Sequence, residues 1–249
     1  RIKNPWFTKS NIDIAISSIK ECLSFDNIHS LLSNYDIPSI DAKRVLVIMA
    51  GNIPLVGFSD LFCVLITGNR LVVKFSSKDD VLIRFLLDKI IEVDSRISSY
   101  IEIIEDVVKS DFDAVIATGS DSSSKYFNYY FDSYKKIIRK NRRSIAVLDG
   151  AETDHELELL SDDIFMYFGL GCRSVSKLFL PPKYDFDKLF NAFYRYKDVI
   201  NHLKYSNNYN YNKTIYLMNN ENIFDNGFVL LKEDVSIQSS ISTLFYEFY

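Results

Sequence analysis

Residues 44–54 read RVLVIMAGNIP, and this stretch decides the fold class. After Arg44 the segment is an unbroken apolar run that ends at Gly51, which is typical of a strand buried on both faces of a parallel sheet. Pro54 stands where a helix can begin, because its fixed backbone angle suits the first helical turn. The segment therefore predicts a strand, a tight turn and a helix, in that order.

The same order repeats along the first part of the chain. Further strands are predicted at residues 71–75, 100–104, 114–117 and 144–148, with segments of helical length between them. Strands that alternate with helices form parallel sheets covered by helices on both faces. The predicted fold class is therefore α/β with a doubly wound parallel sheet.

The pattern changes after Gly150. The elements predicted beyond it include a helix (154–168), a strand (177–180), a loop rich in Asn and Tyr (207–213) and a strand (214–218). This change predicts two domains, residues 1–149 and residues 150–249.

The composition indicates a globular protein without a large charge excess. Its 249 residues are 47% hydrophobic and 25% charged, which is enough to form a sizeable core. The formal net charge is −4, so the chain lacks the global positive field that attracts nucleic acids or anionic membranes. We therefore expect no nucleic-acid partner, and a charged ligand would need a local site.

Residues 45–67 are apolar enough to be tested as a membrane span. Asn52, Pro54 and Asp60 interrupt them, and an unpaired Asp in lipid costs about 2.5 kcal/mol or more. No stable membrane insertion is predicted, and the segment is interpreted as a strand, a turn and a helix.

The cysteine content fits a reducing compartment. Cys22, Cys63 and Cys172 lie far apart, and neither they nor the three histidines have the spacing of a zinc site or a disulfide framework. We expect no bound metal and a cytoplasmic location. Cys22 and Cys63 fall on apolar helical faces and are interpreted as inert packing residues.

Two turns lie where parallel sheets bind ligands, at the carboxyl ends of predicted strands. Asn52 follows the first strand, and its amide can either donate to a developing oxyanion or cap the next helix. Thr118, Gly119 and Ser120 form a strand-to-helix turn that can approach a phosphate, since free amides at a helix start attract anions. A well-capped helix start is the alternative for this second turn.

Cys172 differs from the other two cysteines in its neighbours. Residues 169–174 read GLGCRS, with glycine on one side of the thiol and Arg173 on the other. A thiol held at a Gly-rich turn near cationic or amide dipoles has a lowered pKa and becomes a nucleophile. This pattern predicts a reactive cysteine.

The order of these motifs resembles the aldehyde dehydrogenase superfamily. Within it, residues 50–58 (AGNIPLVGF), 138–142 (IRKNR) and 169–177 (GLGCRSVSK) resemble the acyl-CoA reductase branch related to the LuxC fatty-acid reductases. The resemblance implies the fold of that superfamily, with residues 1–149 as the nicotinamide-cofactor domain and residues 150–249 as the thiol-bearing catalytic domain, incomplete at its C-terminal end.

The resemblance also implies an activity and a role for each matching residue. Cys172 matches the nucleophile that takes an acyl group from acyl-CoA, and Asn52 matches the side-chain oxyanion donor. Lys74 matches the lysine that holds the adenosine ribose. The turn of Thr118, Gly119 and Ser120 matches the one beside the cofactor pyrophosphate. The implied reaction is the reduction of acyl-CoA to an aldehyde, and a homo-oligomer is left open.

Two departures from the superfamily pattern refine this expectation. Aldehyde-oxidising members carry a Glu-Leu-Gly-Gly segment whose glutamate activates water, whereas residues 147–150 read VLDG here. Ser77 stands where a glutamate often repels the 2′-phosphate of NADP, so NADPH is expected in preference to NADH. Two other functions remain open: an aldehyde or semialdehyde dehydrogenase working in the oxidative direction, and a non-catalytic nucleotide-binding scaffold.

Overall fold

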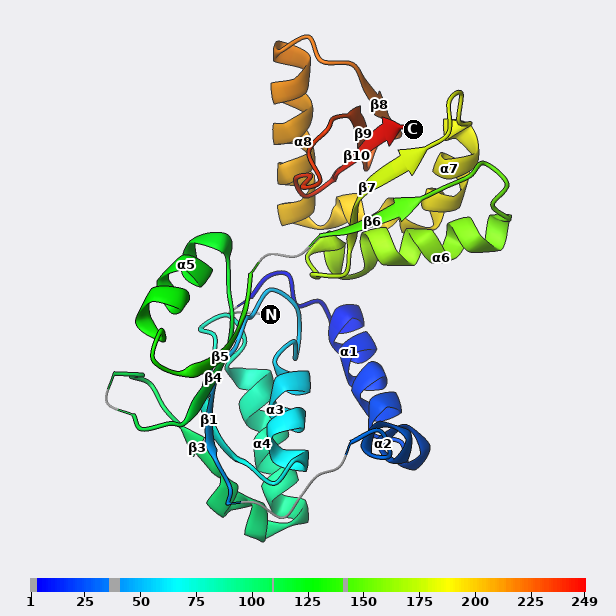
Figure 1. The fold of residues 1–249 in the computed structure, drawn as a ribbon. Coiled ribbons are helices and arrows are strands. Elements are labelled where there is room, and N and C mark those ends of the chain that lie inside the picture. Colours follow the sequence, from blue (N-terminus) through cyan, green and yellow to red (C-terminus); the bar gives the residue numbers. More distant parts are fainter. Residues whose placement is uncertain (1–3, 36–40, 109, 141–142) are drawn as a thin grey trace. The chain divides into compact units, whose positions relative to one another are not determined.

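The computed structural model describes residues 4–35, 41–108, 110–140 and 143–249 and divides the chain into two compact units (Figure 1). The first unit is Arg1–Asn141 and the second is Arg142–Tyr249. Each has its own sheet and its own hydrophobic core, and each is described by itself below.

The first unit contains a five-stranded parallel sheet in the order β3-β2-β1-β4-β5. Its strands are β1 (Arg44–Ile48), β2 (Arg70–Lys74), β3 (Ile101–Ile103), β4 (Ala114–Thr118) and β5 (Lys135–Arg139). Leu46 and Val47 are successive residues of the central strand, point to opposite faces and are both fully buried. The apolar run of β1 is unbroken because both faces of the strand are buried. The predicted parallel sheet is confirmed.

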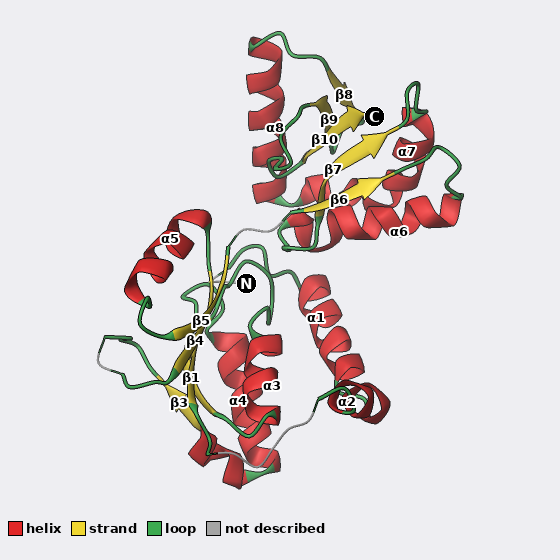
Figure 2. Ribbon diagram, in the orientation of Figure 1, coloured by secondary structure: helices red, strands yellow, loops and turns green. Residues whose placement is uncertain are grey.

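Helices cover both faces of this sheet (Figure 2). The helices of this unit are α1 (Lys9–Cys22), α2 (Phe25–Leu32), α3 (Phe58–Ile66), α4 (Val81–Val93), the 3-10 helix η1 (Ser95–Tyr100) and α5 (Asp121–Tyr130). α3 and α4 lie on one face, and α5 lies on the other, against β4 and β5. This is the doubly wound arrangement that the alternating pattern predicts.

Chain order and spatial order diverge at β1. The chain continues from β1 to β2 and β3 on one side, and then crosses to β4 and β5 on the other. Because all five strands are parallel, their carboxyl ends share one edge, and the loops after β1 and β4 leave that edge in opposite directions. Open α/β sheets bind ligands at such a switch point.

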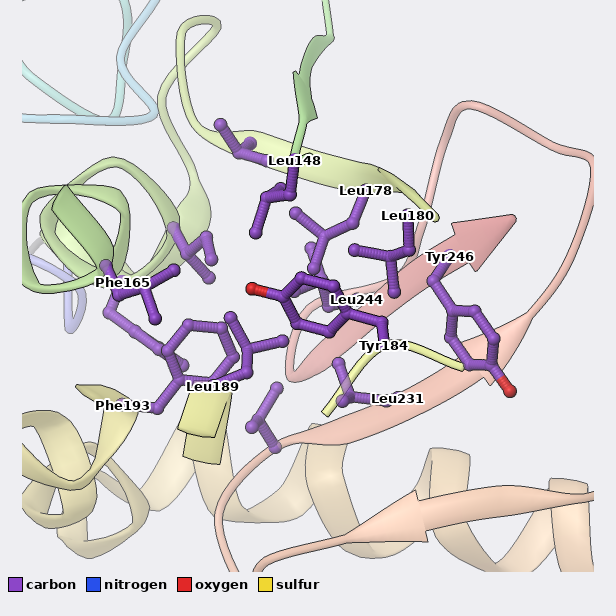
Figure 3. Packing of buried hydrophobic residues seen from close by; sticks show 14 of the residues in the cluster. Leu148, Phe165, Leu178, Leu180, Tyr184, Leu189, Phe193, Leu231, Leu244 and Tyr246 are labelled. Carbon is purple, nitrogen blue, oxygen red and sulfur yellow. The ribbon is translucent and has the colours of Figure 1, made fainter. Parts of the chain in front are cut away.

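The second unit contains a sheet in the order β6-β7-β10-β9-β8, parallel except for β8. Its elements are β6 (Ser144–Val147), α6 (Asp154–Phe165), η2 (Met166–Gly169), β7 (Val175–Leu180), α7 (Phe186–Phe193), η3 (Tyr194–Asn201), α8 (Leu203–Met218), β8 (Ile223–Asp225), β9 (Leu230–Glu233) and β10 (Thr243–Phe248). On one face, Leu178 and Leu244 from the strands pack with Phe165, Leu189 and Phe193 from the helices (Figure 3).

The boundary between the units falls eight residues earlier than the predicted one after residue 149. Residues 144–147 do form the predicted strand, but this strand, β6, pairs with β7 of the second sheet. The last strand of the first sheet is instead β5, whose sequence KKIIR carries three cations and has no fully buried residue. An edge strand of this kind lacks the apolar run that identifies a buried strand.

α8 corrects the prediction of a loop at residues 207–213 and a strand at residues 214–218. Both segments lie in one helix of 16 residues. Its buried side chains are Tyr205, Tyr209, Asn212 and Tyr216, at the spacing of one helical face. α8 is the longest helix of the described residues, and none of the helices among them is long and apolar enough to cross a membrane.

Candidate functional site

The loop that carries Asn52 is closely packed on both sides. The Nδ2 of Asn4, a buried residue, donates to the carbonyl oxygen of Gly51 at 3.1 Å. A Cβ on Gly51 would lie 2.4 Å from the Oγ of Ser76, so only glycine allows this loop to approach the loop after β2. Leu55 adopts a left-handed φ of 57°, which turns the chain toward α3. Asn52 itself is half-buried.

Lys74 and Ser77 lie at the end of the strand next to β1. Lys74 is the last residue of β2 and pairs in register with Ile48, the last residue of β1. Its Nζ donates to the carbonyl oxygen of Glu105 at 3.0 Å, toward the β3 side of the sheet. Ser77 is exposed in the loop that follows. Both residues therefore belong to the same sheet edge as Asn52.

The turn at Thr118, Gly119 and Ser120 begins α5. The Oγ of Ser120 accepts a hydrogen bond from the backbone amide of Ser123 at 3.2 Å, so the predicted helix cap is present. A Cβ on Gly119 would lie 2.8 Å from the Cβ of Ser123, so the glycine is required for the close approach of the turn to the helix. A helix start of this kind favours an anion, because the helix dipole is positive at its N-terminal end.

The first unit thus brings together all six of its predicted site residues. They lie at or shortly after the carboxyl ends of β2, β1 and β4, which are three neighbouring strands, at one edge of the sheet. The ribose and phosphates of a dinucleotide need hydrogen-bond donors. This edge offers a lysine, a serine and the backbone amides of a Gly-containing turn at a helix start. The arrangement fits a dinucleotide cofactor, whereas the role of each residue stays a prediction.

Cys172 lies in the second unit, on the turn between η2 and β7. Its side chain is exposed, and the turn is closed by a hydrogen bond from the Ser174 amide to the Gly171 carbonyl at 3.1 Å. Immediately before the turn, Tyr167 and Phe168 both have left-handed φ values, 54° and 59°. Such strained backbone persists only where surrounding contacts over-determine it. The Gly-rich sequence thus forms a turn that presents the thiol to solvent.

The packing role predicted for Cys22 and Cys63 is wrong. Both side chains are exposed, because α1 and α3 direct them away from the sheet core. The pKa of the Cys63 thiol is raised by partial burial and by the nearby carboxylate of Asp60. Exposure alone therefore does not distinguish Cys172 from the other thiols, and its distinction lies in the turn.

The two carboxylates nearest the absent glutamate differ in their surroundings. Glu152 is tied into the structure: its Oε1 accepts from the Asp149 amide at 2.6 Å, and its Oε2 accepts from the Tyr184 hydroxyl at 3.1 Å. Burial and the Glu152 charge raise the pKa of Tyr184. Glu152 thus holds the loop between β6 and α6, and Asp149 is exposed in the same loop.

Two residues that belong to none of the sequence motifs are prominent in the structure. Asp79 is 5% exposed and accepts a hydrogen bond from the Leu55 amide. Lys177 is fully buried in β7, and its Nζ donates to Oε2 of Glu247 at 2.5 Å and to the carbonyl of Asp234 at 2.6 Å. A lysine inside the apolar strand VSKLFL was the available signal for the second.

The fold is that of the aldehyde dehydrogenases. A putative aldehyde dehydrogenase from Burkholderia cenocepacia superposes with a TM-score of 0.62 at 13% identity, over 84% of this chain and 54% of that one. Aldehyde dehydrogenase C from Pseudomonas syringae, solved as a C291A mutant with NAD+ and octanal, gives a TM-score of 0.64 at 11% identity, over 88% of this chain and 57% of that one. At these identities the likeness establishes the fold alone.

Within that fold class, the chain belongs to the LuxC family of acyl-CoA reductases, whose family model matches residues 25–216. A long-chain acyl-protein thioester reductase from Photobacterium leiognathi is 27% identical over 182 residues, which cover 66% of this chain and 38% of that protein. The chain therefore spans well under half of this relative. The family resemblance read from residues 50–58, 138–142 and 169–177 is confirmed.

Proposed function

We propose that the protein reduces the acyl group of a thioester to an aldehyde, with Cys172 as the nucleophile and NADPH as the reductant. The observation that carries the proposal is an exposed thiol on a Gly-rich turn, inside the part of the chain that matches the acyl-CoA reductase family. The name of the Photobacterium relative, a long-chain acyl-protein thioester reductase, supports a thioester substrate. Acyl-CoA is the form of thioester that we expect.

The first half-reaction uses only groups of this chain. The Cys172 thiolate attacks the thioester carbonyl, and the amide of Asn52 donates to the oxygen that becomes negative. The bond between the carbonyl carbon and the sulfur of CoA then breaks. CoA departs as a thiolate, which takes up a proton from solvent, and the acyl group stays on Cys172.

The second half-reaction returns the thiol. A reduced nicotinamide, when bound, supplies the hydride. With that hydride and a proton the acyl group becomes a thiohemiacetal on Cys172, in which the Asn52 amide again faces the oxygen. Its hydroxyl releases a proton to solvent, the carbon–sulfur bond breaks as the oxygen forms the aldehyde carbonyl, and the thiolate of Cys172 is regenerated.

The cofactor would lie along the edge formed by the ends of β2, β1 and β4. In the proposal, Lys74 and Ser77 hold the adenosine ribose and its 2′-phosphate, and the turn of Thr118, Gly119 and Ser120 lies against the pyrophosphate. The positions of these residues on neighbouring strands support this assignment. Ser77 brings no negative charge against a 2′-phosphate, and this favours NADPH over NADH.

The surroundings of Glu152 favour acyl transfer over hydrolysis. An aldehyde-oxidising enzyme needs a base that activates water, and the Glu152 carboxylate instead accepts hydrogen bonds from Asp149, Gly150 and Tyr184. Transfer of an acyl group between two thiols needs no such base. This difference supports the proposed function over an oxidative dehydrogenase.

The test is a steady-state assay of the full-length protein with acyl-CoAs of graded chain length, followed by NADPH absorbance and aldehyde trapping. We expect aldehyde formation that Cys172→Ala abolishes, while NADPH binding remains. Oxidation of added aldehyde without CoA would instead establish an oxidative dehydrogenase. NADPH binding without turnover of any thioester would establish a nucleotide-binding scaffold.

We also propose a cytoplasmic location, because all three cysteines are unpaired in the described structure and an exposed catalytic thiol needs a reducing compartment. Whether the protein forms a homo-oligomer stays a prediction, which light scattering of the full-length protein can test.

A further inference from the structure

The chain reverses direction at Leu55, directly after the Asn52 turn. Leu55 is 7% exposed and has a φ of 57°. A leucine adopts this left-handed conformation at a cost, since its Cβ crowds the following carbonyl group. The contacts around Leu55 must therefore hold this conformation, and with it the path of residues 52–55.

Asp79 supplies the polar contact at this point. Its Oδ2 accepts a hydrogen bond of 2.8 Å from the Leu55 amide, and both residues are buried. The other oxygen, Oδ1, is buried and has no hydrogen-bond partner among the described residues. A carboxylate is costly to bury, and the backbone amides of Leu55 and Leu82 both stabilise its charge.

Asp79 belongs to the loop that leaves β2. It lies two residues after Ser77 and five after Lys74, in the segment that packs against Gly51 through Ser76 and Lys78. The same loop therefore carries the proposed ribose contacts. It also contacts both ends of the Asn52 turn, by packing at Gly51 and by a hydrogen bond at Leu55.

We propose that Asp79 is a positioning residue that fixes the backbone of residues 52–55 and thereby orients the amide of Asn52, the proposed oxyanion donor. The proposal rests on the proposed function for the role of Asn52, whereas the link from Asp79 to the loop rests on the hydrogen bond to Leu55 alone. Asp79 is buried and would act through the backbone of Leu55.

The kinetic test is a double-mutant cycle in the full-length protein. Asp79→Ala should lower kcat by about tenfold with little change in the KM for NADPH, and Asp79→Asn, which keeps an acceptor for the Leu55 amide, should restore most of the rate. In an Asn52→Ala background, Asp79→Ala should cost nothing further, because the group it aims is gone. Asp88→Ala, an exposed carboxylate of α4, is the matched control and should be neutral.

Hydrogen exchange tests the link without any assay of activity. In the wild type, the Leu55 amide should exchange at least about a hundredfold more slowly than an unstructured amide, and Asp79→Ala should remove this protection. Fast exchange in the wild type, or unchanged protection in the variant, would overturn the proposal. So would a kcat loss of equal size in the Asn52→Ala background. An inactive wild type would refute the proposed function but would leave the protection of the Leu55 amide unchanged. A failure of the proposed function can therefore be distinguished from a failure of the link between Asp79 and Leu55.

Discussion

At the scale of single residues, Asp79 makes the stability of the first unit depend on pH. Burial, aided by the charge of Asp80, raises its pKa to about 6 against the hydrogen bond from Leu55, which lowers it. Between about pH 4 and pH 6 the folded chain therefore holds a proton that the unfolded chain has lost. Protonation stabilises the fold fully below this window, and that contribution is lost as the pH rises through the folded pKa.

Asp79→Asn removes this titration, so it should gain stability over the wild type as the pH rises. We expect the difference in unfolding free energy to move in favour of the variant by about 1 to 3 kcal/mol between pH 4 and pH 7, and to stay constant above that. Urea unfolding followed by the fluorescence of Trp6, the single tryptophan, reports this unit. A difference that does not change with pH would show that Asp79 ionises normally.

Ser77 provides a second prediction at this scale, the choice of cofactor. Ser77→Glu places a negative charge where the 2′-phosphate is proposed to lie and offers an acceptor to two free ribose hydroxyls. The ratio of kcat/KM for NADPH to that for NADH should therefore fall by about tenfold to a hundredfold, since a charge-assisted hydrogen bond contributes about 1.5 to 3 kcal/mol. Ser17→Glu, on the exposed side of α1, is the control for added charge. An unchanged ratio would place Ser77 outside the adenosine site.

Local motifs and distant contacts differ in how far they could be predicted. Some site residues can be recognised from their nearest neighbours in the sequence. Asn52 and Gly119 follow predicted strands, and Cys172 lies between glycines and an arginine. Asp79 could not be recognised in this way, because its partner Leu55 lies 24 residues earlier and the two meet only through neighbouring strands. Its sequence context, two acidic residues before a helix, is that of an ordinary helix start.

At the scale of elements, α8 is a helix although its composition is rich in weak helix formers, because its tyrosines are spaced to pack on one face. Asn and Tyr are weak helix formers, so the segment LKYSNNYNYNKTIYLM favours a loop on propensity alone. Its tyrosines, however, recur on one face: the Tyr209 hydroxyl donates to Asp225, and Tyr216 packs near Leu230. Tertiary packing therefore determines this helix, and a search for apolar periodicity misses it when the periodic residue is tyrosine.

β7 and β10 are joined by an ion pair with unequal burial. Lys177 is 0% exposed, whereas the side chain of Glu247 is 38% exposed. Water can solvate the carboxylate if the lysine is removed, but it does not reach the ammonium if the carboxylate is neutralised. The two partners of this pair should therefore differ in the cost of their removal.

Glu247→Gln should lower the unfolding free energy by about 2 kcal/mol or more, and Lys177→Met by about 1 kcal/mol. The first variant removes the carboxylate that is paired with a buried cation, and the second loses mainly the hydrogen bonds to Glu247 and Asp234. Hydrogen exchange of β7 and β10 in the two variants measures this order. The reverse order would mean that the ammonium is better solvated than its exposure indicates.

At the scale of the whole molecule, the proposed catalytic groups are divided between the two units. Asn52 and the cofactor residues belong to Arg1–Asn141, and Cys172 belongs to Arg142–Tyr249. The division could be predicted from the change of pattern near Gly150, but its position could not, because the sequence of β6 does not reveal which sheet it joins. Only its register with β7 assigns it to the second unit.

The two half-reactions should be separable, because the first needs the thiol and not the reductant. Mixed with a long-chain acyl-CoA alone, the full-length protein should gain the mass of one acyl group, and peptide mapping should locate it on Cys172. Adding NADPH should remove that mass and release one equivalent of aldehyde. Asn52→Ala should slow the gain by about a hundredfold, since an oxyanion donor contributes about 3 kcal/mol in the transition state. Acylation of Cys22 or Cys63, which are also exposed, or an acyl group that NADPH does not discharge, would contradict the assignment of Cys172.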